Sequence, residues 1–569
     1  MKRPGCIFPA LMLAFVVLMS LPWLVPHCGW TALFGLLPLL IMERLATQQK
    51  TRHFWWWHYG TFVLWNAVTT WWVAGATVGG AIFAILANSL QKSAIFGTFR
   101  WVKRRAGGVL PYIFLAAAWI AWERYYYTVA DFNWPWLVFG NAFADTTGLV
   151  QWYSVLGTLG GSLWVWASNL ALFGLMVALS DGRMARWNGK ARLVAFMAPV
   201  LVLFGPMLWS ACLKPSEKAF TEVLDVEIGQ PNFDPYHKFE SMTQEQQDTV
   251  FLGLLAKEDL GRPLLVMAPE TFTSGFRLDF PGNNASFRRY QAWLAAHPSA
   301  TLLFGASAYD GTISRTAPSL LCYDQGEVDT RGNHLWLTSR NSAIVTDTSG
   351  RCEVFHKSKL VLGTELTPYP KLFVPLEQKL FGGPVMGKCV GQPEISCLHV
   401  RMGDRMVPVG TAVCYESIFG EYCTGYVKKG AELLTVITND AWWGNTPGYR
   451  QHFNFSRLRA IETRRYVARC GNTGISAIIG PDGRVLERTP WWQPAVLRGQ
   501  VHLSTRQTFF VRYGDIVGRL SVFLFALLLL AALFRPSGPS GSSGSSRPSG
   551  SSGPSRSFGS SRPSGPSRS

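Results

Sequence analysis

Charged side chains are scarce in this 569-residue chain, where Asp, Glu, Lys and Arg together make up only 15%. Soluble domains carry about 25% charged residues and rarely exceed about 300 residues, so one ordinary soluble domain is excluded. Zinc-finger spacing and RNA-binding aromatic motifs are also missing, so the formal charge of +18 does not indicate a nucleic-acid partner. Basic residues instead flank apolar segments, an arrangement that suits anionic lipid headgroups.

Long apolar segments crowd into the first 212 residues and into one block near the end. A helical span of a bilayer needs about 20 mostly apolar residues. We predict eight spans, the second of them short, at residues 7–24, 31–42, 58–76, 80–99, 110–127, 156–179, 193–212 and 516–534. The first is not a secretory signal peptide, because further apolar segments follow at once and no small-residue cleavage site ends it.

The loops between these segments alternate in charge. Lys and Arg gather in the cytoplasmic loops of membrane proteins. They occur before the first span and in every second loop after it, at Lys2, Arg3, Arg44, Lys50, Arg52, Arg100, Lys103, Arg104, Arg105, Arg183, Arg186, Lys190 and Arg192. The intervening loops, 25–30, 77–79 and 128–155, contain neither residue. This pattern predicts that both termini are cytoplasmic and that residues 213–513 lie outside the cytoplasm.

Charged residues inside the predicted spans include Lys92, Glu123 and Arg124. Lys92 is expected to snorkel to the interface or to mark an earlier cytoplasmic end of its helix. Glu123 and Arg124 are expected either to pair with each other or to reach the interface. Tryptophans in the loop 131–153 are expected to anchor span ends at the interface, with a role in admitting acyl chains as the alternative.

Residues 213–513 change to short apolar strands that alternate with polar helical stretches. We predict strands at residues 224–228, 263–268, 301–306, 342–346, 352–355, 407–413, 431–438 and 474–479. We predict helices at 239–257, 287–296 and 453–469. This alternation favours one layered α/β domain. The chain then divides into a membrane domain (1–212), this domain (213–513), a last span (514–534) and a tail (535–569) of Ser, Gly, Pro and Arg, which is predicted to be disordered.

Three chemically active residues each follow the end of a predicted strand: Glu270, Lys357 and Cys414. Strand ends at one edge of a sheet meet in space, so we expect the three side chains to converge. The carboxylate would take the thiol proton, the ammonium would lower the thiol pKa and hold an oxyanion, and the thiolate would attack a carbonyl carbon. The alternative is that Cys414 is a buried structural cysteine.

Three motifs carry a resemblance: Ala268-Pro269-Glu270, then His356-Lys357-Ser358-Lys359-Leu360-Val361 with Glu365, then Cys414-Tyr415-Glu416. They resemble the Glu-Lys-Cys triad of the nitrilase (carbon–nitrogen hydrolase) superfamily. The spans narrow this resemblance to the apolipoprotein N-acyltransferases, over about residues 5–534. Further agreement comes from Gln230-Pro231-Asn232, Asn439-Asp440-Ala441-Trp442-Trp443-Gly444, Gln451-His452, Arg457-Leu458-Arg459-Ala460-Ile461-Glu462, Asn472-Thr473-Gly474-Ile475-Ser476 and Gly480-Pro481-Asp482-Gly483.

The resemblance implies a fold and a set of roles. The fold is a nitrilase-like α-β-β-α sandwich attached to a polytopic helical membrane domain. Glu270 would be the general base, Lys357 the oxyanion and orienting group, and Cys414 the nucleophile. The N–H of Tyr415 would complete the oxyanion hole. Glu365 and Glu416 would be further carboxylates, besides Glu270, that orient Lys357 or the incoming amine. In the family, Pro-Phe-Gly often precedes the glutamate that corresponds to Glu365. This chain has Leu362-Gly363-Thr364 at that place.

The implied reaction moves a fatty acyl chain from a phospholipid, through a Cys414 thioester, to the α-amine of the N-terminal diacylglyceryl-cysteine of an apolipoprotein. It needs no cofactor or metal. The implied setting is the bacterial inner membrane, with a monomer whose catalytic domain faces the periplasm. One alternative is a membrane-anchored nitrilase-type amidase, in which water replaces the amine. Another is a transporter or scaffold with a degenerate α/β domain, which would leave Cys414 unreactive.

Several neighbours have alternatives of their own. Lys359 could replace Lys357 as the functional lysine, although the family spacing to Glu365 favours Lys357. His356 and His452 are expected to be structural or interfacial, and Asp440 to order the turn after its strand. Trp442 and Trp443 are expected to pack or to line an acyl groove. The seven cysteines of the α/β region allow three disulfides and a free Cys414.

Overall fold

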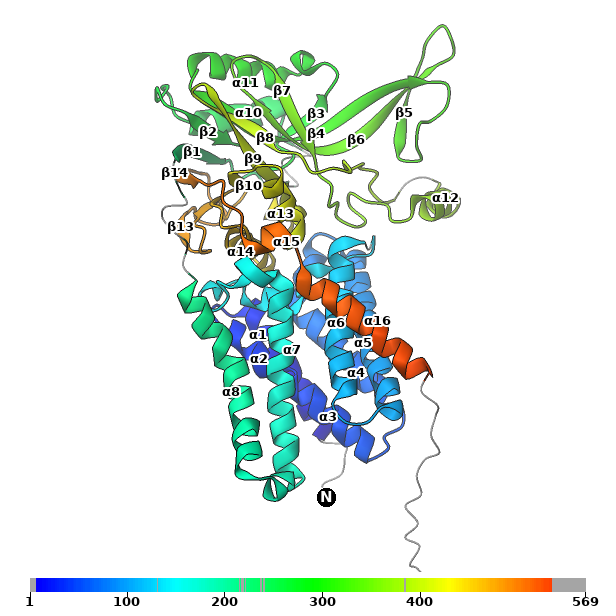
Figure 1. Ribbon diagram of the computed structural model, residues 1–569. Coiled ribbons are helices and arrows are strands. Elements are labelled where there is room, and N and C mark those ends of the chain that lie inside the picture. The colour runs from blue at the N-terminus through cyan, green and yellow to red at the C-terminus, as the bar shows by residue number, and fades with distance from the viewer. Residues whose placement is uncertain are drawn as a thin grey trace, which may run out of the picture.

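The computed structural model describes residues 7–129, 131–213, 215, 220, 222–235, 238, 241–382 and 385–534. A bundle of helices supports an α/β domain at one end, and the last long helix returns along the bundle (Figure 1). The predicted tail, 535–569, and the basic pair Lys2-Arg3 lie outside the described residues.

Every predicted span corresponds to a helical segment. The bundle consists of α1 (Ile7–Leu24), α2 (Ala32–Gly35), α3 (Leu37–Gln48), α4 (Phe54–Thr70), α5 (Val78–Arg105), α6 (Leu110–Thr128), α7 (Tyr153–Ser180), α8 (Gly189–Cys212) and α16 (Ile516–Phe534). Six segments of the described chain are long and apolar enough to cross a membrane: Ile7–Leu24, Gly29–Gln48, α5, α7, α8 and α16. The other two predicted spans are α4, with 17 residues, and α6, with 19.

The basic ends of the helices gather at the end of the bundle that lies away from the α/β domain. The first described residues and the turn between α7 and α8 both lie at this end (Figure 1). Arg44 of α3 forms an ion pair of 2.5 Å with Asp181, which follows α7. Lys103 of α5 forms one of the same length with Glu43 of α3. The charge alternation of the loops therefore corresponds to one basic end of the bundle.

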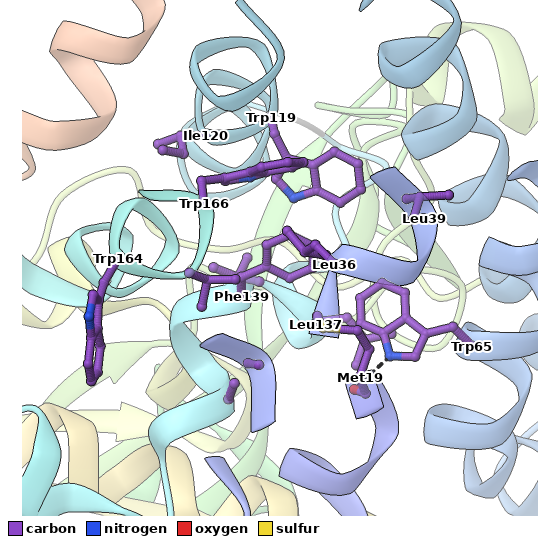
Figure 2. Packing of buried hydrophobic residues seen from close by; sticks show 14 of the residues in the cluster. Met19, Leu36, Leu39, Trp65, Trp119, Ile120, Leu137, Phe139, Trp164 and Trp166 are labelled. Carbon is purple, nitrogen blue, oxygen red and sulfur yellow. Dashed lines mark hydrogen bonds between the residues drawn. The ribbon is translucent and has the colours of Figure 1, made fainter. Parts of the chain in front are cut away.

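Aromatic side chains fill the middle of the bundle. The rings of Trp119 and Phe139 stack with their centroids 4.9 Å apart, and Trp166 meets both (Figure 2). Trp65 donates its indole N–H to the carbonyl of Met19. Trp136 and Trp152, from the loop between α6 and α7, also belong to this buried core, so the expectation that they anchor span ends at the interface was wrong.

The expectation for Lys92 was wrong in both of its forms. Helix α5 continues to Arg105, and Lys92 is buried within the bundle. Its ammonium lies 4.9 Å from the centroid of the Trp119 ring and 5.6 Å from that of Trp65. Cation–π contact with two indoles stabilises the charge away from water, and sequence spacing alone does not reveal such a contact.

Glu123 and Arg124 do not pair with each other, because adjacent residues of a helix point in different directions. Glu123 accepts a hydrogen bond from the backbone N–H of Phe139 at 2.9 Å. Arg124 turns instead to Glu421 and Asp515, at 2.9 and 2.8 Å. The two charges thus serve different parts of the fold.

Two sheets form the α/β domain. The first has the order β14-β1-β2-β4-β6-β5, with β3 paired to β4 and β7 paired to β6; the second has the order β13-β12-β11-β10-β9-β8. The first sheet consists of β1 (Glu222–Gln230), β2 (Leu264–Met267), β3 (Thr273–Arg277), β4 (Ala300–Ser314), β5 (Cys322–Val328), β6 (His334–Thr346), β7 (Cys352–His356) and β14 (Ala495–Leu503). The second consists of β8 (Leu398–Met402), β9 (Arg405–Val413), β10 (Leu433–Thr438), β11 (Val467–Gly471), β12 (Ala477–Ile479) and β13 (Val485–Arg488).

Successive side chains of β2 point into two different cores, one under the helices and one between the two sheets. Leu264 and Val266 pack with Tyr290 into the core under α10 (Gln244–Leu254) and α11 (Ala285–Ala296). Leu265 and Met267 point the other way, into the core between the sheets. Helices α13 (Gly420–Lys428) and α14 (Pro447–Thr463) accompany the second sheet. The predicted α-β-β-α sandwich is therefore confirmed; short helices α12 (Pro370–Phe381) and α15 (Phe509–Tyr513) complete it.

Several predicted bounds differ from those in the structure, and one of these differences exchanges a helix for a strand. The helix expected over 453–469 ends at Thr463, where Arg464 adopts a left-handed conformation, and residues from Val467 onward form β11. This strand is buried throughout, and a short apolar segment of this kind has no periodicity that distinguishes strand from helix. The nine cysteines that the structure describes all have free thiols, so the disulfides that their number allows are not formed among them.

The two halves share one core. Phe419, Phe455 and Ile461 of the α/β domain belong to the same buried cluster as Trp136 and Phe139 of the bundle. The end of β9 therefore lies next to the membrane helices.

Candidate active site

Cys414 lies where β9 ends and a short 3-10 helix, Cys414–Ile418, begins. Its φ of 54° is in the left-handed region, which non-glycine residues adopt only when the surrounding structure holds them there. The strand belongs to the second sheet, whereas Glu270 follows β2 and Lys357 follows β7, both in the first sheet. The expectation of a single sheet edge was wrong, because two facing sheets contribute to the site.

Glu270, Lys357 and Glu365 form a buried charged cluster. The ammonium of Lys357 lies 3.0 Å from Glu270 and 2.9 Å from Glu365, and its side chain is only 1% exposed. Asn341, on β6, donates hydrogen bonds from its amide to both carboxylates, at 2.8 and 2.7 Å. The backbone N–H of Asn439 donates to the second oxygen of Glu270. No sequence motif marked Asn341, although it holds both carboxylates in place.

The charges in this cluster set the protonation of the site. Burial disfavours the ammonium, but Glu270 and Glu365 outweigh it and raise the pKa of Lys357 well above its ordinary value. Burial and the charge of Glu270 together raise the pKa of the Cys414 thiol, while Lys357 acts in the opposite direction. The expected effect of the lysine on the thiol pKa is present but is outweighed by burial and by Glu270.

Glu416 contacts backbone groups around Cys414 and Lys357. Its carboxylate accepts hydrogen bonds from the backbone N–H groups of Val413, Ser358 and Lys359, at 2.8, 2.7 and 3.2 Å, and from the hydroxyl of Tyr422 at 2.9 Å. Burial raises the pKa of Glu416 to about 7. These bonds join the end of β9 to the loop after β7, and so fix Cys414 relative to Lys357.

The neighbouring lysine and histidine are not part of the charged cluster. The ammonium of Lys359 lies 5.4 Å from the centroid of the Phe419 ring and 5.6 Å from that of Tyr422, and burial lowers its pKa. His356 shares a hydrogen bond of 2.8 Å with the hydroxyl of Ser342. The geometry therefore places Lys357 rather than Lys359 beside Glu270, as the spacing predicted.

A cavity of about 430 Å³ lies between Cys414 and the helices of the bundle. Its lining includes Cys414 and Tyr415 of the α/β domain and one face of α5, with Gly79, Gly80, Ala84 and Ala87. Trp443, one of the two tryptophans expected to pack or to line a groove, lies on its wall, together with residues of the loops 132–136 and 361–364. The stripe of small residues on α5 is the signal from which sequence reasoning could have found this wall.

His452, on α14, also lines the cavity. Together with Cys414 and Asp440 it places one potential metal-binding atom per residue within 4.8 Å of the others. Asp440, however, already binds Arg469 at 2.6 Å and the hydroxyl of Thr438 at 2.7 Å. A guanidinium at this position repels a metal cation, so the donor set does not suit a metal.

Two sequence-family models match the chain. One, described as carbon-nitrogen hydrolase, matches residues 264–509, and the other, described as apolipoprotein N-acyltransferase N-terminal domain, matches residues 16–171. The apolipoprotein N-acyltransferase of Chlorobaculum tepidum is 28% identical over 90% of this chain and 93% of its own length. That of Gloeobacter violaceus is 27% identical over 91% of this chain and 92% of its own length. The chain belongs to the apolipoprotein N-acyltransferase family.

Membership of the apolipoprotein N-acyltransferase family covers both halves of the molecule, so the predicted resemblance is confirmed. The protein is a membrane-integral acyltransferase whose catalytic domain has the carbon–nitrogen hydrolase fold. The amidase alternative is not favoured, because the relatives match the helical half as well as the α/β domain.

Proposed function

We propose that the protein transfers an acyl chain from a membrane phospholipid to the α-amine of the N-terminal diacylglyceryl-cysteine of an apolipoprotein, by way of a thioester on Cys414. The cavity supports this proposal most directly. It joins Cys414 to the wall of α5, a helix long and apolar enough to cross a membrane, so a lipid can reach the thiol without leaving the bilayer. A hydrolase of soluble amides would not need this route.

The first half-reaction uses the charged cluster. Glu270 takes the thiol proton as the sulfur of Cys414 attacks the ester carbonyl carbon. The negative charge that develops on the carbonyl oxygen is stabilised by Lys357 and by the backbone N–H of Tyr415. The C–S bond forms, the ester C–O bond breaks, and the proton held by Glu270 passes to the leaving oxygen of the lysophospholipid.

The second half-reaction reverses these roles. Glu270 takes a proton from the lipoprotein α-amine as its nitrogen attacks the thioester carbon. The C–N bond forms, the C–S bond breaks, and the proton returns to the sulfur of Cys414. Glu365 keeps Lys357 in position throughout, since it lies 2.9 Å from the ammonium. The two substrates use one site in turn, which gives ping-pong kinetics.

We also propose that the enzyme lies in the bacterial inner membrane as a monomer, with its catalytic domain in the periplasm and both termini in the cytoplasm. The basic helix ends at the far end of the bundle support this orientation. One chain also supplies all three groups of the proposed triad.

Mass spectrometry of the intact protein tests the reaction. The full chain in detergent micelles, mixed with phospholipid, should gain the mass of one acyl chain on Cys414, and a diacylated lipopeptide should remove it. Cys414→Ala should gain none and should transfer none. Acyl transfer at a normal rate by Cys414→Ala would contradict the proposal, and so would release of ammonia from amides without any acyl transfer.

A further inference from the structure

The carbonyl oxygen of Cys414 is held by two side chains that lie outside the proposed triad. The hydroxyl of Ser417 donates to it at 2.8 Å, and Nε2 of His452 lies 3.1 Å from it. Nε2 also lies 3.1 Å from the Ser417 hydroxyl. His452 is buried on α14, 38 residues away in the sequence, so the fold brings it to this carbonyl.

The other ring nitrogen of His452 faces a carboxylate. Nδ1 lies 2.8 Å from Asp440, and Arg469 contacts both, at 2.6 Å from the carboxylate and 3.2 Å from Nδ1. Burial opposes ionisation of Asp440, but His452 and Arg469 outweigh it and lower its pKa, so its oxygens accept hydrogen bonds. A peptide carbonyl only accepts hydrogen bonds, so Nε2 of His452 is the donor in its contact with the Cys414 carbonyl.

The ring is fixed in the plane that this geometry requires. Trp136, from the loop between α6 and α7, stacks on it with centroids 5.8 Å apart and planes 30° apart. Trp443 meets it edge-on at 5.6 Å. The indole N–H of Trp136 in turn donates to Gln451 at 2.7 Å. The membrane half therefore helps to hold His452 against the carbonyl of Cys414.

We propose that His452, with Ser417, is a positioning residue that aims and strengthens the backbone N–H of Tyr415 as an oxyanion donor. That N–H and the Cys414 carbonyl belong to one planar trans peptide unit, so holding the oxygen fixes the direction of the N–H. A hydrogen bond to the oxygen also polarises the unit and makes its N–H a stronger donor. The inference rests on the proposed function, because it assigns this N–H to the oxyanion of that reaction.

Two reactions of Cys414 separate this role from simple packing. Acylation by phospholipid passes through an oxyanion, whereas alkylation by iodoacetamide does not. His452→Phe keeps an aromatic ring between Trp136 and Trp443 but cannot donate. It should slow acylation about 100-fold, the effect of losing one oxyanion donor, and leave the alkylation rate within about threefold. His452→Gln retains an N–H donor and should restore part of the acylation rate.

A second buried histidine provides the control. His58 of α4 shares a hydrogen bond with Ser93 at 2.7 Å and packs between Phe54 and Phe96, so His58→Phe makes the same chemical change far from Cys414. It should alter neither rate. Acylation of His452→Phe at the wild-type rate would overturn the inference, and so would an equal loss of both rates. Absence of any acyl-enzyme in the wild-type protein would instead overturn the proposed function.

Discussion

Arg124 of α6 and Glu421 of α13 form an ion pair of 2.9 Å between the bundle and the α/β domain. The same guanidinium nitrogen lies 2.8 Å from Asp515, the residue that precedes α16. One cation thus joins a membrane helix, the catalytic domain and the last helix of the chain. The cavity beside Cys414 has walls from both halves, so its shape depends on how firmly they are joined.

Replacing Arg124 should weaken this junction. Arg124→Gln leaves two carboxylates without their cation, and the Arg124 side chain is only 19% exposed. Loss of one partner of a fully buried pair costs about 3–5 kcal/mol, and partial exposure reduces this to about 2 kcal/mol in the free energy of unfolding. Chemical unfolding in detergent micelles, followed by tryptophan fluorescence, measures the change.

A pair at the basic end of the bundle provides the comparison. Arg183 lies 3.1 Å from Asp181 but is 60% exposed, so Arg183→Gln should change the free energy by less than about 0.5 kcal/mol. Adding Glu421→Gln to Arg124→Gln should recover part of the loss, because it removes one of the unpaired carboxylates. Equal losses from Arg124→Gln and Arg183→Gln would show that the junction does not depend on this pair.

Asn341 should prove essential for catalysis although no motif contains it. Its amide donates to Glu270 and Glu365 at once. Asn341→Asp keeps the shape but replaces two donors by acceptors and adds a third negative charge against one lysine. We expect acyl transfer to fall by about 100-fold or more, since a missing positioning contact typically costs that much. Transfer to a diacylated lipopeptide measures the rate.

The same substitution elsewhere serves as the control. Asn284 caps the first turn of α11 by accepting a hydrogen bond from the N–H of Phe287. Aspartate caps a helix as well as asparagine does, so Asn284→Asp should retain full activity. An Asn341→Asp variant as active as Asn284→Asp would exclude a role for the amide in holding the carboxylates.

The residue types of the site could be predicted from the sequence, but their arrangement could not. Glu270, Lys357 and Cys414 follow apolar strands, and this local pattern is visible without a structure. Their origin in two different sheets depends on which strands pair, and the pairing partners are far apart in the sequence. The contact of His452 with the Cys414 carbonyl is equally non-local. Reasoning from residue frequencies therefore assigned His452 a structural or interfacial place only.

The bundle illustrates the same limit. Helix positions follow from apolar length, which is a local property, and so α16 was predicted with its observed bounds. Whether a charged side chain of a helix is buried or lies at an interface depends on residues of other helices that pack against it. Lys92 was therefore expected at an interface, whereas the indoles of Trp65 and Trp119 surround it inside the bundle.

The pH dependence of Cys414 alkylation should respond to its two charged neighbours in opposite directions. Iodoacetamide reacts with the thiolate, and burial together with Glu270 raises the pKa of this thiol, so the rate should still increase above pH 9. Glu270→Gln removes a negative charge and should shift the rate profile to lower pH. Lys357→Met removes a positive charge and should shift it to higher pH.

Both variants should nevertheless lose acyl transfer. The Glu270→Gln thiol ionises more easily but has no base to take its proton when it attacks an ester. Site-specific mass spectrometry follows alkylation, with Cys322 of β5 as an internal reference that neither substitution should affect. A Glu270→Gln profile at higher pH than the wild-type profile would contradict the electrostatic role of Glu270.

The cavity along α5 should set the length of acyl chain that the enzyme accepts. Its lining residues on this helix run from Gly79 to Gln91, a rise of about 18 Å at 1.5 Å per residue. One leaflet of a bilayer contributes half of a hydrocarbon core of about 30 Å, so this wall matches one acyl chain. Ala84→Trp should fill the middle of the cavity. It should slow acylation of Cys414 by long-chain phospholipids about tenfold, because overpacking costs about 1–3 kcal/mol, and leave short-chain donors nearly unaffected.

Ile82 provides the matched substitution on the same helix. Its side chain is 55% exposed on the surface of the bundle, so Ile82→Trp adds bulk outside the cavity. It should leave the preference between long and short donors unchanged, as measured by competition between two phospholipids and the mass of the acyl group on Cys414. If Ile82→Trp and Ala84→Trp both slowed acylation by long-chain donors relative to short-chain donors, bulk on α5 would be acting through the packing of the bundle. The acyl chain would then have to enter along a different wall.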